Sequence, residues 1–326
     1  MTDDEPITLN TTPTKYNYVL TFISHNDDNT SFLRNITLYI DKITTSYFPN
    51  DDIHFTSTKV LSPRAQDHYF TSSNPNIKTP PPVPLQSNLD AIIQRDTIYR
   101  KRKSLVAFDM DSTLIKQEVI ELIASYAGVE PQVHDITQRA MNNELDFAES
   151  LRLRVQLLKG LPIETLYDEI KSKLVFTEGV RLLCRCLKKI GVYLVVLSGG
   201  FVPFAEFVKR ELEMDYMKAN VLGVDRNQKN SPVLNGEVVG EIVDGECKRE
   251  TVLSLCKKLK IPIESSCMVG DGANDVPAML ACGFGVAWNA KPNVQKVAPC
   301  RLNTRSLLDV MYIFGYTDAE IGELLK

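Results

Sequence analysis

The sequence lacks several features, and each absence excludes a class of protein. No apolar run among its 326 residues approaches the roughly 20 that span a bilayer, so we expect no membrane partner. Basic residues are not in excess: the net charge of −4 and the pI of about 5.7 argue against a nucleic-acid partner. The acidic, polar start, MTDDEPITLN, resembles neither a secretory signal nor a transit peptide. We therefore expect a cytoplasmic protein.

The seven cysteines do not suggest a disulfide framework, because they are odd in number, scattered and mostly set in apolar segments. Cys184 and Cys186 stand two apart in a predicted helix, so their thiols face different ways and make a poor metal clip. Hydrophobic residues at 44% and charged residues at 24% are ordinary for a chain that buries a core. The length suits two unequal domains, and a homodimer is left open.

Residues 1–73 are predicted to form a small α+β domain. Residues 16–24 alternate as a strand does, 32–43 have helical spacing, and 53–61 look extended. Residues 74–103 are predicted to be a proline-rich linker and connecting segment, since the closely spaced prolines of NPNIKTPPPVP favour an extended connector.

From residue 104 to 326 short apolar strands alternate with longer helices. This order predicts an α/β fold with a Rossmann-like parallel sheet, whose ligands bind at the carboxyl ends of the strands. An amphipathic stretch after the first strand is too long for a plain crossover, so we expect an inserted helical cap over about 118–176. The predicted strands are 105–108, 192–197, 267–269 and 284–288.

The first polar motif is Asp109-Met110-Asp111, at the end of a strand that leaves an apolar interior. Two crowded carboxylates raise each other's pKa, and a repulsion of roughly 4 kcal/mol per pair at ~4 Å calls for a positive partner. Hard oxygen ligands in this setting suit Mg²⁺. The alternative is a solvated turn in which Asp111 or Ser112 caps a helix.

The second motif, Gly270-Asp271-Gly272-Ala273-Asn274-Asp275, also follows a predicted strand. It begins like a dinucleotide loop, but a third glycine is missing and the carboxylates of Asp271 and Asp275 would repel a pyrophosphate. They would instead help to hold a metal ion. An ordinary Asp-Gly turn, with Asn274 as a helix cap, is the alternative.

Two weaker signals complete the set. Ser198-Gly199-Gly200 follows a third strand, where small residues let backbone N–H groups approach an anion, although a tight turn explains it equally well. Lys248 is predicted in the first turn of a helix, where the helix dipole disfavours a cation unless it points at a phosphate. Alone, such a lysine is usually solvated.

In chain order these motifs resemble the four motifs of the haloacid dehalogenase-like hydrolases. Five segments are similar to the branch of that superfamily that hydrolyses phosphoserine, over about two thirds of the chain, and roughly the first 100 residues lie outside the resemblance. That first region could be a regulatory ligand-binding domain, a scaffold or a docking unit. The segments are DMDSTLIKQEVIELIA, ITQRAMNNELDFAESLRLRVQLLKGLP, LSGGF, NGEVVGEI and GDGANDVPAML.

The resemblance implies a phosphatase with Asp109 as the nucleophile, which forms an aspartyl-phosphate. Asp111 would act first as general acid and then as general base. Mg²⁺ would be held by Asp109, the backbone carbonyl of Asp111 and Asp271, with Asp275 orienting the waters of the metal. The phosphoryl group would be bound by Ser198, Gly199, Lys248 and Asn274.

Selectivity would come from the cap. The resemblance implies that Glu118 takes the ammonium group of phosphoserine and that Arg154 takes its carboxylate, while Met141 and Phe147 close over the serine stem. The reaction would be the last step of serine biosynthesis. Two alternatives remain: a Mg²⁺-dependent phosphatase of another small phosphomonoester, such as phosphothreonine or a sugar phosphate, and a non-catalytic phosphate-binding regulatory module.

Overall fold

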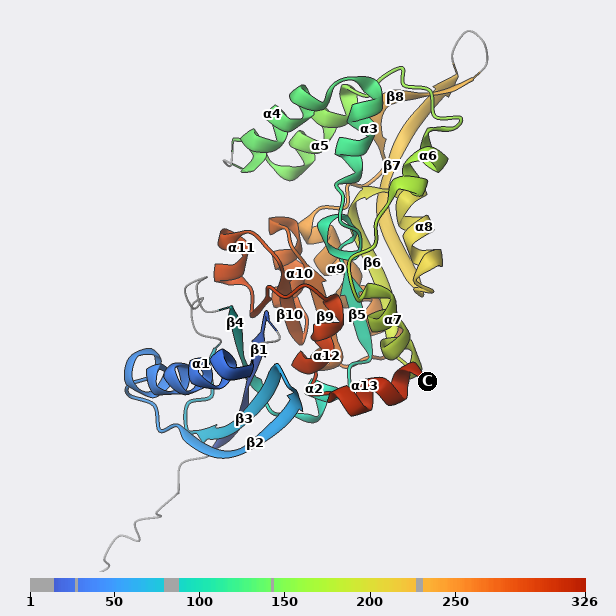
Figure 1. Cartoon of the computed structure of the whole chain (residues 1–326). Coiled ribbons are helices and arrows are strands. Elements are labelled where there is room, and N and C mark those ends of the chain that lie inside the picture. Colours follow the sequence, from blue (N-terminus) through green and yellow to red (C-terminus); the bar gives the residue numbers. More distant parts are fainter. Residues whose placement is uncertain (1–14, 27–28, 79–87, 142–143, 227–230) are drawn as a thin grey trace, which may run out of the picture.

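The computed structural model contains two sheets, one in an N-terminal domain and one in a larger domain that carries a helical cap (Figure 1). It describes residues 15–26, 29–78, 88–141, 144–226 and 231–326. The proline-rich stretch 79–87 and the side chain of Met141 lie outside the described residues. In the described part of the chain, no helix combines the length and apolarity needed to cross a membrane.

The N-terminal domain is an antiparallel sheet of order β2-β3-β1-β4 with a helix on one face. Helix α1 buries Phe32, Ile36 and Tyr39 against the sheet residues Phe22 and Phe70. Their spacing along α1 places them on one helical face, as the sequence predicts. The elements are β1 (Tyr16–Ser24), α1 (Asn29–Lys42), a π-helical turn (Ile43–Tyr47), β2 (His54–Ser62), β3 (Ala65–Ser72) and β4 (Leu89–Arg95).

The first domain extends beyond the boundary at residue 73 that the sequence predicts. Strand β4 lies in the segment expected to be a connection, yet it pairs with β1 from Leu89 to Arg95 and closes one edge of the sheet. The reason is its surroundings: Asp90 and Gln94 are buried against the larger domain, so the strand does not show a solvent-facing polar side. The prediction missed this strand and β3.

The larger domain has the predicted Rossmann-like core, a sheet of order β11-β10-β9-β5-β6-β7-β8 in which only the β7–β8 pair is antiparallel. Central strand β5 is buried along its whole length, as a parallel strand covered by helices on both faces should be. The core elements are α2 (Ile98–Lys101), β5 (Leu105–Phe108), α7 (Val180–Lys189), β6 (Tyr193–Phe201), α8 (Val202–Glu211), β7 (Tyr216–Arg226), β8 (Pro232–Val239), α9 (Gly245–Leu259), β9 (Ser266–Gly270), α10 (Val276–Ala281), β10 (Phe284–Trp288), α11 (Pro292–Val297), β11 (Cys300–Leu302), α12 (Val310–Ile313) and α13 (Asp318–Leu325).

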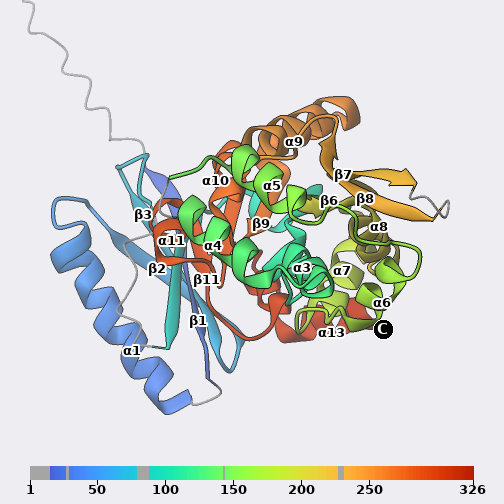
Figure 2. The same cartoon turned by 90° about the horizontal axis from the view of Figure 1, so that it is seen from above.

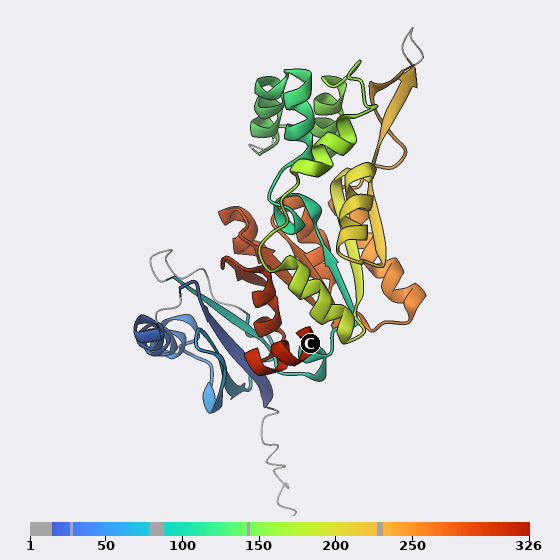
Figure 3. The ribbon, with the colours of Figure 1, turned by 45° about the vertical axis from the view of Figure 1, so that its right-hand side comes forward.

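The cap consists of four helices inserted between β5 and β6, and it lies over the carboxyl ends of the strands (Figure 2). The long β7–β8 hairpin rises beside it (Figure 3), and a bridge between Pro162 and Val233 joins the two. The single helical stretch expected from the sequence is therefore a bundle of short helices. They are α3 (Val119–Ala127), α4 (Glu130–Met141), α5 (Phe147–Gln156) and α6 (Leu166–Lys173).

Buried ion pairs and hydrogen bonds attach the N-terminal domain to the core. Arg100 donates to the Asp67 carboxylate at 2.7 Å, and Arg64 pairs with Asp309. Asp90 on β4 accepts from the backbone N–H and the side chain of Asn303, just beyond β11. Edge strand β4 therefore meets the β11 edge through the Asp90–Asn303 hydrogen bonds, while the two ion pairs join other parts of the domains.

Candidate active site

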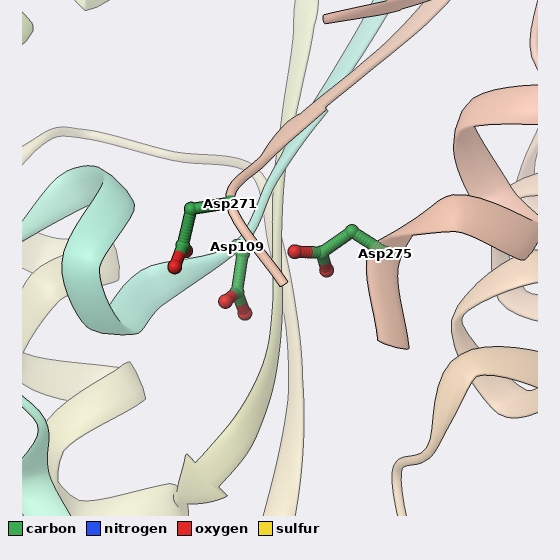
Figure 4. A group of neighbouring side chains, drawn as sticks. All are labelled: Asp109, Asp271 and Asp275. Atoms are coloured by element: carbon green, nitrogen blue, oxygen red, sulfur yellow. The ribbon is translucent and has the colours of Figure 1, made fainter. Parts of the chain in front are cut away.

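Three neighbouring strands carry the polar motifs to one edge of the sheet. Asp109 follows β5, Asp271 follows β9, and Ser198 lies near the end of β6, on the other side of β5. Because these strands are parallel, their carboxyl ends meet, and the carboxylates of Asp109, Asp271 and Asp275 point toward a shared space (Figure 4). The convergence expected from the sequence is present.

Lys248 reaches this space from helix α9. The helix begins after Asp244, whose carboxylate accepts from the Cys247 N–H at 2.9 Å, so Lys248 lies in the first turn. Its side chain is fully buried, and its Nζ donates to Asp109 Oδ1 and to Asp275 Oδ1, each at 2.6 Å. The lysine is therefore part of the cluster and not a solvated surface residue.

The pKa values of the carboxyl groups reflect the crowding. Burial, followed by the charge of Asp275, raises the pKa of Asp109 well above its ordinary value. Burial and Glu118 do the same to the pKa of Asp111. Burial and Asp275 raise the pKa of Asp271 to about 7. Burial alone would lower the pKa of Lys248, but the carboxylates of Asp109 and Asp275 outweigh it and raise that pKa.

A metal ion fits among these carboxylates. One oxygen from each of Asp109, Asp271 and Asp275 lies within 4.8 Å of the others, and Thr113 Oγ1 donates to Asp271 Oδ1 at 3.0 Å. Hard carboxylate oxygens suit a hard divalent cation. The carboxylate of Asp111 is not in this group and lies near Gly200, where a Cβ would come within 2.8 Å of its Oδ2. Its backbone carbonyl therefore remains the predicted ligand.

The loop Ser198-Gly199-Gly200 requires small residues. A Cβ on Gly199 would lie 2.8 Å from the ring of Phe147, which descends from cap helix α5. The N–H of Gly200 donates to Ser198 Oγ at 2.9 Å. The hydroxyl oxygen is thus already an acceptor, which leaves its hydrogen to donate to a ligand.

A cavity of about 990 Å³ lies between the cap and the strand ends. Glu118 and Arg154 line it from the cap, and Glu118 accepts from Ser112 Oγ at 2.7 Å while Arg154 Nε donates to the Ser150 carbonyl. Ser198, Lys248 and Asp275 are fully buried at or behind its floor. The other predicted residues that line the cavity are Asp109, Asp111, Phe147, Gly199, Asp271 and Asn274.

Two buried residues that no sequence motif predicted, Thr113 and Asn220, support this site. Thr113 orients Asp271, and its own carbonyl accepts from Thr177 Oγ1 at 2.6 Å. Asn220, on β7, holds the Gly199 carbonyl. Thr113 could have been found from its place directly after the aspartate pair. No local pattern marks Asn220, because it becomes important only through strand pairing.

Comparisons with known proteins identify the family. A family model for haloacid dehalogenase-like hydrolases matches residues 103–283. The phosphoserine phosphatase of Saccharomyces cerevisiae is 55% identical over 276 residues, which cover 83% of this chain and 88% of the yeast protein.

Two solved structures are also similar. A phospho-aspartyl intermediate analogue of phosphoserine phosphatase has a TM-score of 0.60 and 38% identity, covering 65% of this chain and 99% of that one. A probable phosphoserine phosphatase from Vibrio cholerae, in unliganded form, has a TM-score of 0.64 and 26% identity over 94% of this chain and 89% of its own. The chain belongs to the haloacid dehalogenase-like hydrolases and, within them, to the phosphoserine phosphatase family.

Proposed function

We propose that this chain hydrolyses O-phospho-L-serine to L-serine and phosphate through an aspartyl-phosphate on Asp109, the last step of serine biosynthesis. The observation that carries the proposal is the cluster of Asp109, Asp271 and Asp275 at the strand ends, in which the buried ammonium group of Lys248 bonds to Asp109 and Asp275. The carboxyl group of Asp111 lies next to this cluster, and Asp109 and Asp271 contribute to its raised pKa. The 55% identical yeast relative bears the name of this activity.

We propose Mg²⁺ as the cation, held by Asp109, Asp271 and the backbone carbonyl of Asp111, with Asp275 orienting its waters. When bound, the ion supplies positive charge that offsets repulsion between the carboxylates and the phosphoryl group. Lys248 fixes the carboxylates of Asp109 and Asp275 through its two hydrogen bonds. Its charge opposes the rise in the pKa of Asp109 that burial and Asp275 cause. Together with the charge of the cation it would favour the ionised carboxylate that acts as the nucleophile.

Groups on the cavity floor bind the phosphoryl oxygens. The Ser198 hydroxyl, the Gly199 N–H and the Lys248 ammonium converge from two elements, and Asn274 lines the cavity beside them. Donors that are fixed before the reaction stabilise charge as it spreads over the equatorial oxygens. Their burial excludes competing water from the phosphoryl group.

Asp111 transfers the protons. Its Oδ1 is buried and has no hydrogen-bond partner among the described residues, and its raised pKa favours the protonated form. It therefore protonates the departing serine oxygen as Asp109 attacks phosphorus. The resulting carboxylate then takes a proton from the water that cleaves the aspartyl-phosphate, which regenerates Asp109.

The cap selects the substrate. Glu118 binds the ammonium group of phosphoserine and Arg154 its carboxylate, a planar match that lysine cannot make. Phe147 already lies over Gly199 and covers the serine stem. We include Met141 with Phe147 as a predicted contact. A substrate that lacks either charged group leaves a cap residue unpaired, which costs about 1–3 kcal/mol or more.

We also propose a cytoplasmic location. The seven cysteines are all free, and six of them are buried. Unpaired thiols of this kind are usual in a reducing compartment.

The experiment is an assay of phosphate release from phosphoserine, phosphothreonine and glycerol phosphate, each with and without Mg²⁺. We expect Mg²⁺-dependent turnover that is fastest on phosphoserine. Equal rates on all three substrates would contradict the proposed selectivity, and no phosphate release from any of them would contradict the proposed chemistry.

A further inference from the structure

The regular pairing of strand β6 with β7 is interrupted at Ser198–Gly200, the loop that is proposed to bind phosphate and is called the phosphate loop below. Leu197 pairs with Lys218, but the next pair is Phe201 with Asn220, so β6 advances four residues while β7 advances two. The segment between them, Ser198 to Gly200, therefore bulges out of the sheet. Backbone groups in such a bulge lose their ladder partners and need others.

The side chain of Asn220 replaces one of those partners. Asn220 is fully buried, and its Nδ2 donates to the Gly199 carbonyl at 2.8 Å. Its Oδ1 accepts from the Val243 N–H, also at 2.8 Å. The nitrogen and the oxygen of the Asn220 amide therefore each bond to the backbone of a different segment.

The first of these bonds reaches the Ser198 hydroxyl through one peptide unit. The peptide between Gly199 and Gly200 is trans, so its carbonyl and its N–H point to opposite sides. The carbonyl is held by Asn220, and the N–H donates to Ser198 Oγ at 2.9 Å. Asn220 therefore sets the plane of this peptide and, through it, the direction of the Ser198 hydroxyl.

The second bond reaches the segment that carries the lysine. Val243 directly precedes Asp244, which begins helix α9 and accepts from the N–H of Cys247 and, through its carbonyl, from that of Lys248. Asn220 therefore links the loop that carries Ser198 to the helix start that carries Lys248. These two segments supply Ser198, Gly199 and Lys248 to the phosphoryl group.

We propose that Asn220 is a positioning residue that fixes the phosphate loop and the start of α9 in one relative geometry. The inference rests on the proposed phosphatase function. Asn220 is not among the residues that line the cavity, and its two side-chain hydrogen bonds go to the backbone of Gly199 and Val243. It therefore acts on the transition state through Ser198 and Lys248 and leaves recognition of serine unchanged.

The test compares Asn220→Asp with Gln94→Glu. The first variant keeps the acceptor for Val243 but sets a carboxylate oxygen against the Gly199 carbonyl. Gln94 is a matched control, because it is also buried and donates its amide to a backbone carbonyl, that of Ile313, at the domain interface. We expect kcat per folded molecule to fall about 10- to 100-fold in Asn220→Asp, with KM for phosphoserine changed less than about threefold. Gln94→Glu should keep kcat.

The ratio of variant to wild-type kcat is also measured on p-nitrophenyl phosphate, which carries the phosphoryl group without serine. Wild-type activity on phosphoserine tests the proposed function, whereas the variant-to-wild-type ratio on either substrate tests Asn220. A kcat per folded molecule within twofold of wild type, or an equal loss in Gln94→Glu, overturns the proposal. If Asn220→Asp does not fold, Asn220→Ala decides by the same criteria, and failure of both to fold overturns it as well.

Discussion

Two groups of charged residues, one at the domain interface and one at the ends of the parallel strands, are built differently. At the domain interface Arg100 faces Asp67 and Arg64 faces Asp309, so each carboxylate has its own guanidinium. At the carboxyl ends of the parallel strands, Asp109, Asp271 and Asp275 gather three carboxylates, and the ammonium group of Lys248 is bonded to Asp109 and Asp275. The first set is balanced within the chain. The second needs a further cation, and that imbalance distinguishes the catalytic cluster from the structural one.

The difference also sets what each cluster contributes to stability. Removing one partner of a buried, matched pair leaves an uncompensated charge and destabilises the fold. Removing one carboxylate from a crowded cluster relieves repulsion, so the fold tolerates the change while the chemistry does not. The predictions below follow from that contrast.

The largest expected effect is the loss of turnover in Asp109→Asn. The amide cannot attack phosphorus, but its oxygen still accepts from Lys248, so kcat should fall by at least about 10⁴-fold with no decrease in the Tm measured without Mg²⁺. Phosphate release and thermal unfolding measure the two quantities. Asp67→Asn, at the interface, is the control and should keep its kcat. Retained activity in Asp109→Asn would remove it as the nucleophile.

Arg100→Met should lower stability and leave kcat unchanged, which is the reverse of Asp109→Asn. It leaves Asp67 buried and unpaired, so the free energy of unfolding should drop by about 3–5 kcal/mol, while kcat of the folded fraction stays unchanged. Urea unfolding measures the loss. The double variant with Asp67→Leu should recover most of it, because both charges are then absent. A fully stable single variant would contradict the structural role of the pair.

Arg154→Ala should affect selectivity. Without the guanidinium the substrate carboxylate is unpaired, so kcat/KM on phosphoserine should fall about 100-fold, and far less on p-nitrophenyl phosphate. Arg152→Ala is the matched control, since Arg152 lies on the same helix with its side chain exposed. Equal losses on both substrates would argue against a carboxylate clamp.

Metal removal should lower stability and turnover through the catalytic cluster and should not affect the ion pairs at the domain interface. With Mg²⁺ at about 100 times its Kd, binding to the native state adds about 2.7 kcal/mol to the free energy of unfolding. EDTA should remove this stabilisation together with turnover. In Asp271→Asn, EDTA should change neither the free energy of unfolding nor the turnover by much. Calorimetry with and without EDTA measures the effect, and an unchanged wild-type Tm would count against a cation site.

The smallest effect concerns pH in the absence of metal. The pKa of Asp271 is raised to about 7 in the folded state, above its ordinary value near 3.9. Its favourable contribution is therefore present below about pH 4 and is lost as pH rises through about 7. We expect wild type to lose about 2 kcal/mol more than Asp271→Asn between pH 5 and 7. Parallel pH profiles of unfolding would contradict this.

Sequence analysis was most informative in the parallel sheet and least informative in the N-terminal sheet. Strands such as β5 are apolar throughout and end in a polar motif, so local pattern reveals both the strand and its function. Strand β3 instead carries Asp67, whose buried partner Arg100 lies 33 residues away. A polar residue that is buried for a distant partner breaks the alternation by which strands are recognised.

Apolar periodicity and motif spacing are local properties, and they were enough to predict the parallel core, the cap insertion and the residues with chemistry at the strand ends. Three further facts became visible in the folded chain alone: β4 completes the first sheet, Lys248 is fully buried between two carboxylates, and Asn220 reaches the loop Ser198–Gly200. Those facts depend on strand pairing and on charges brought together from distant segments, and no local pattern encodes which segments will meet.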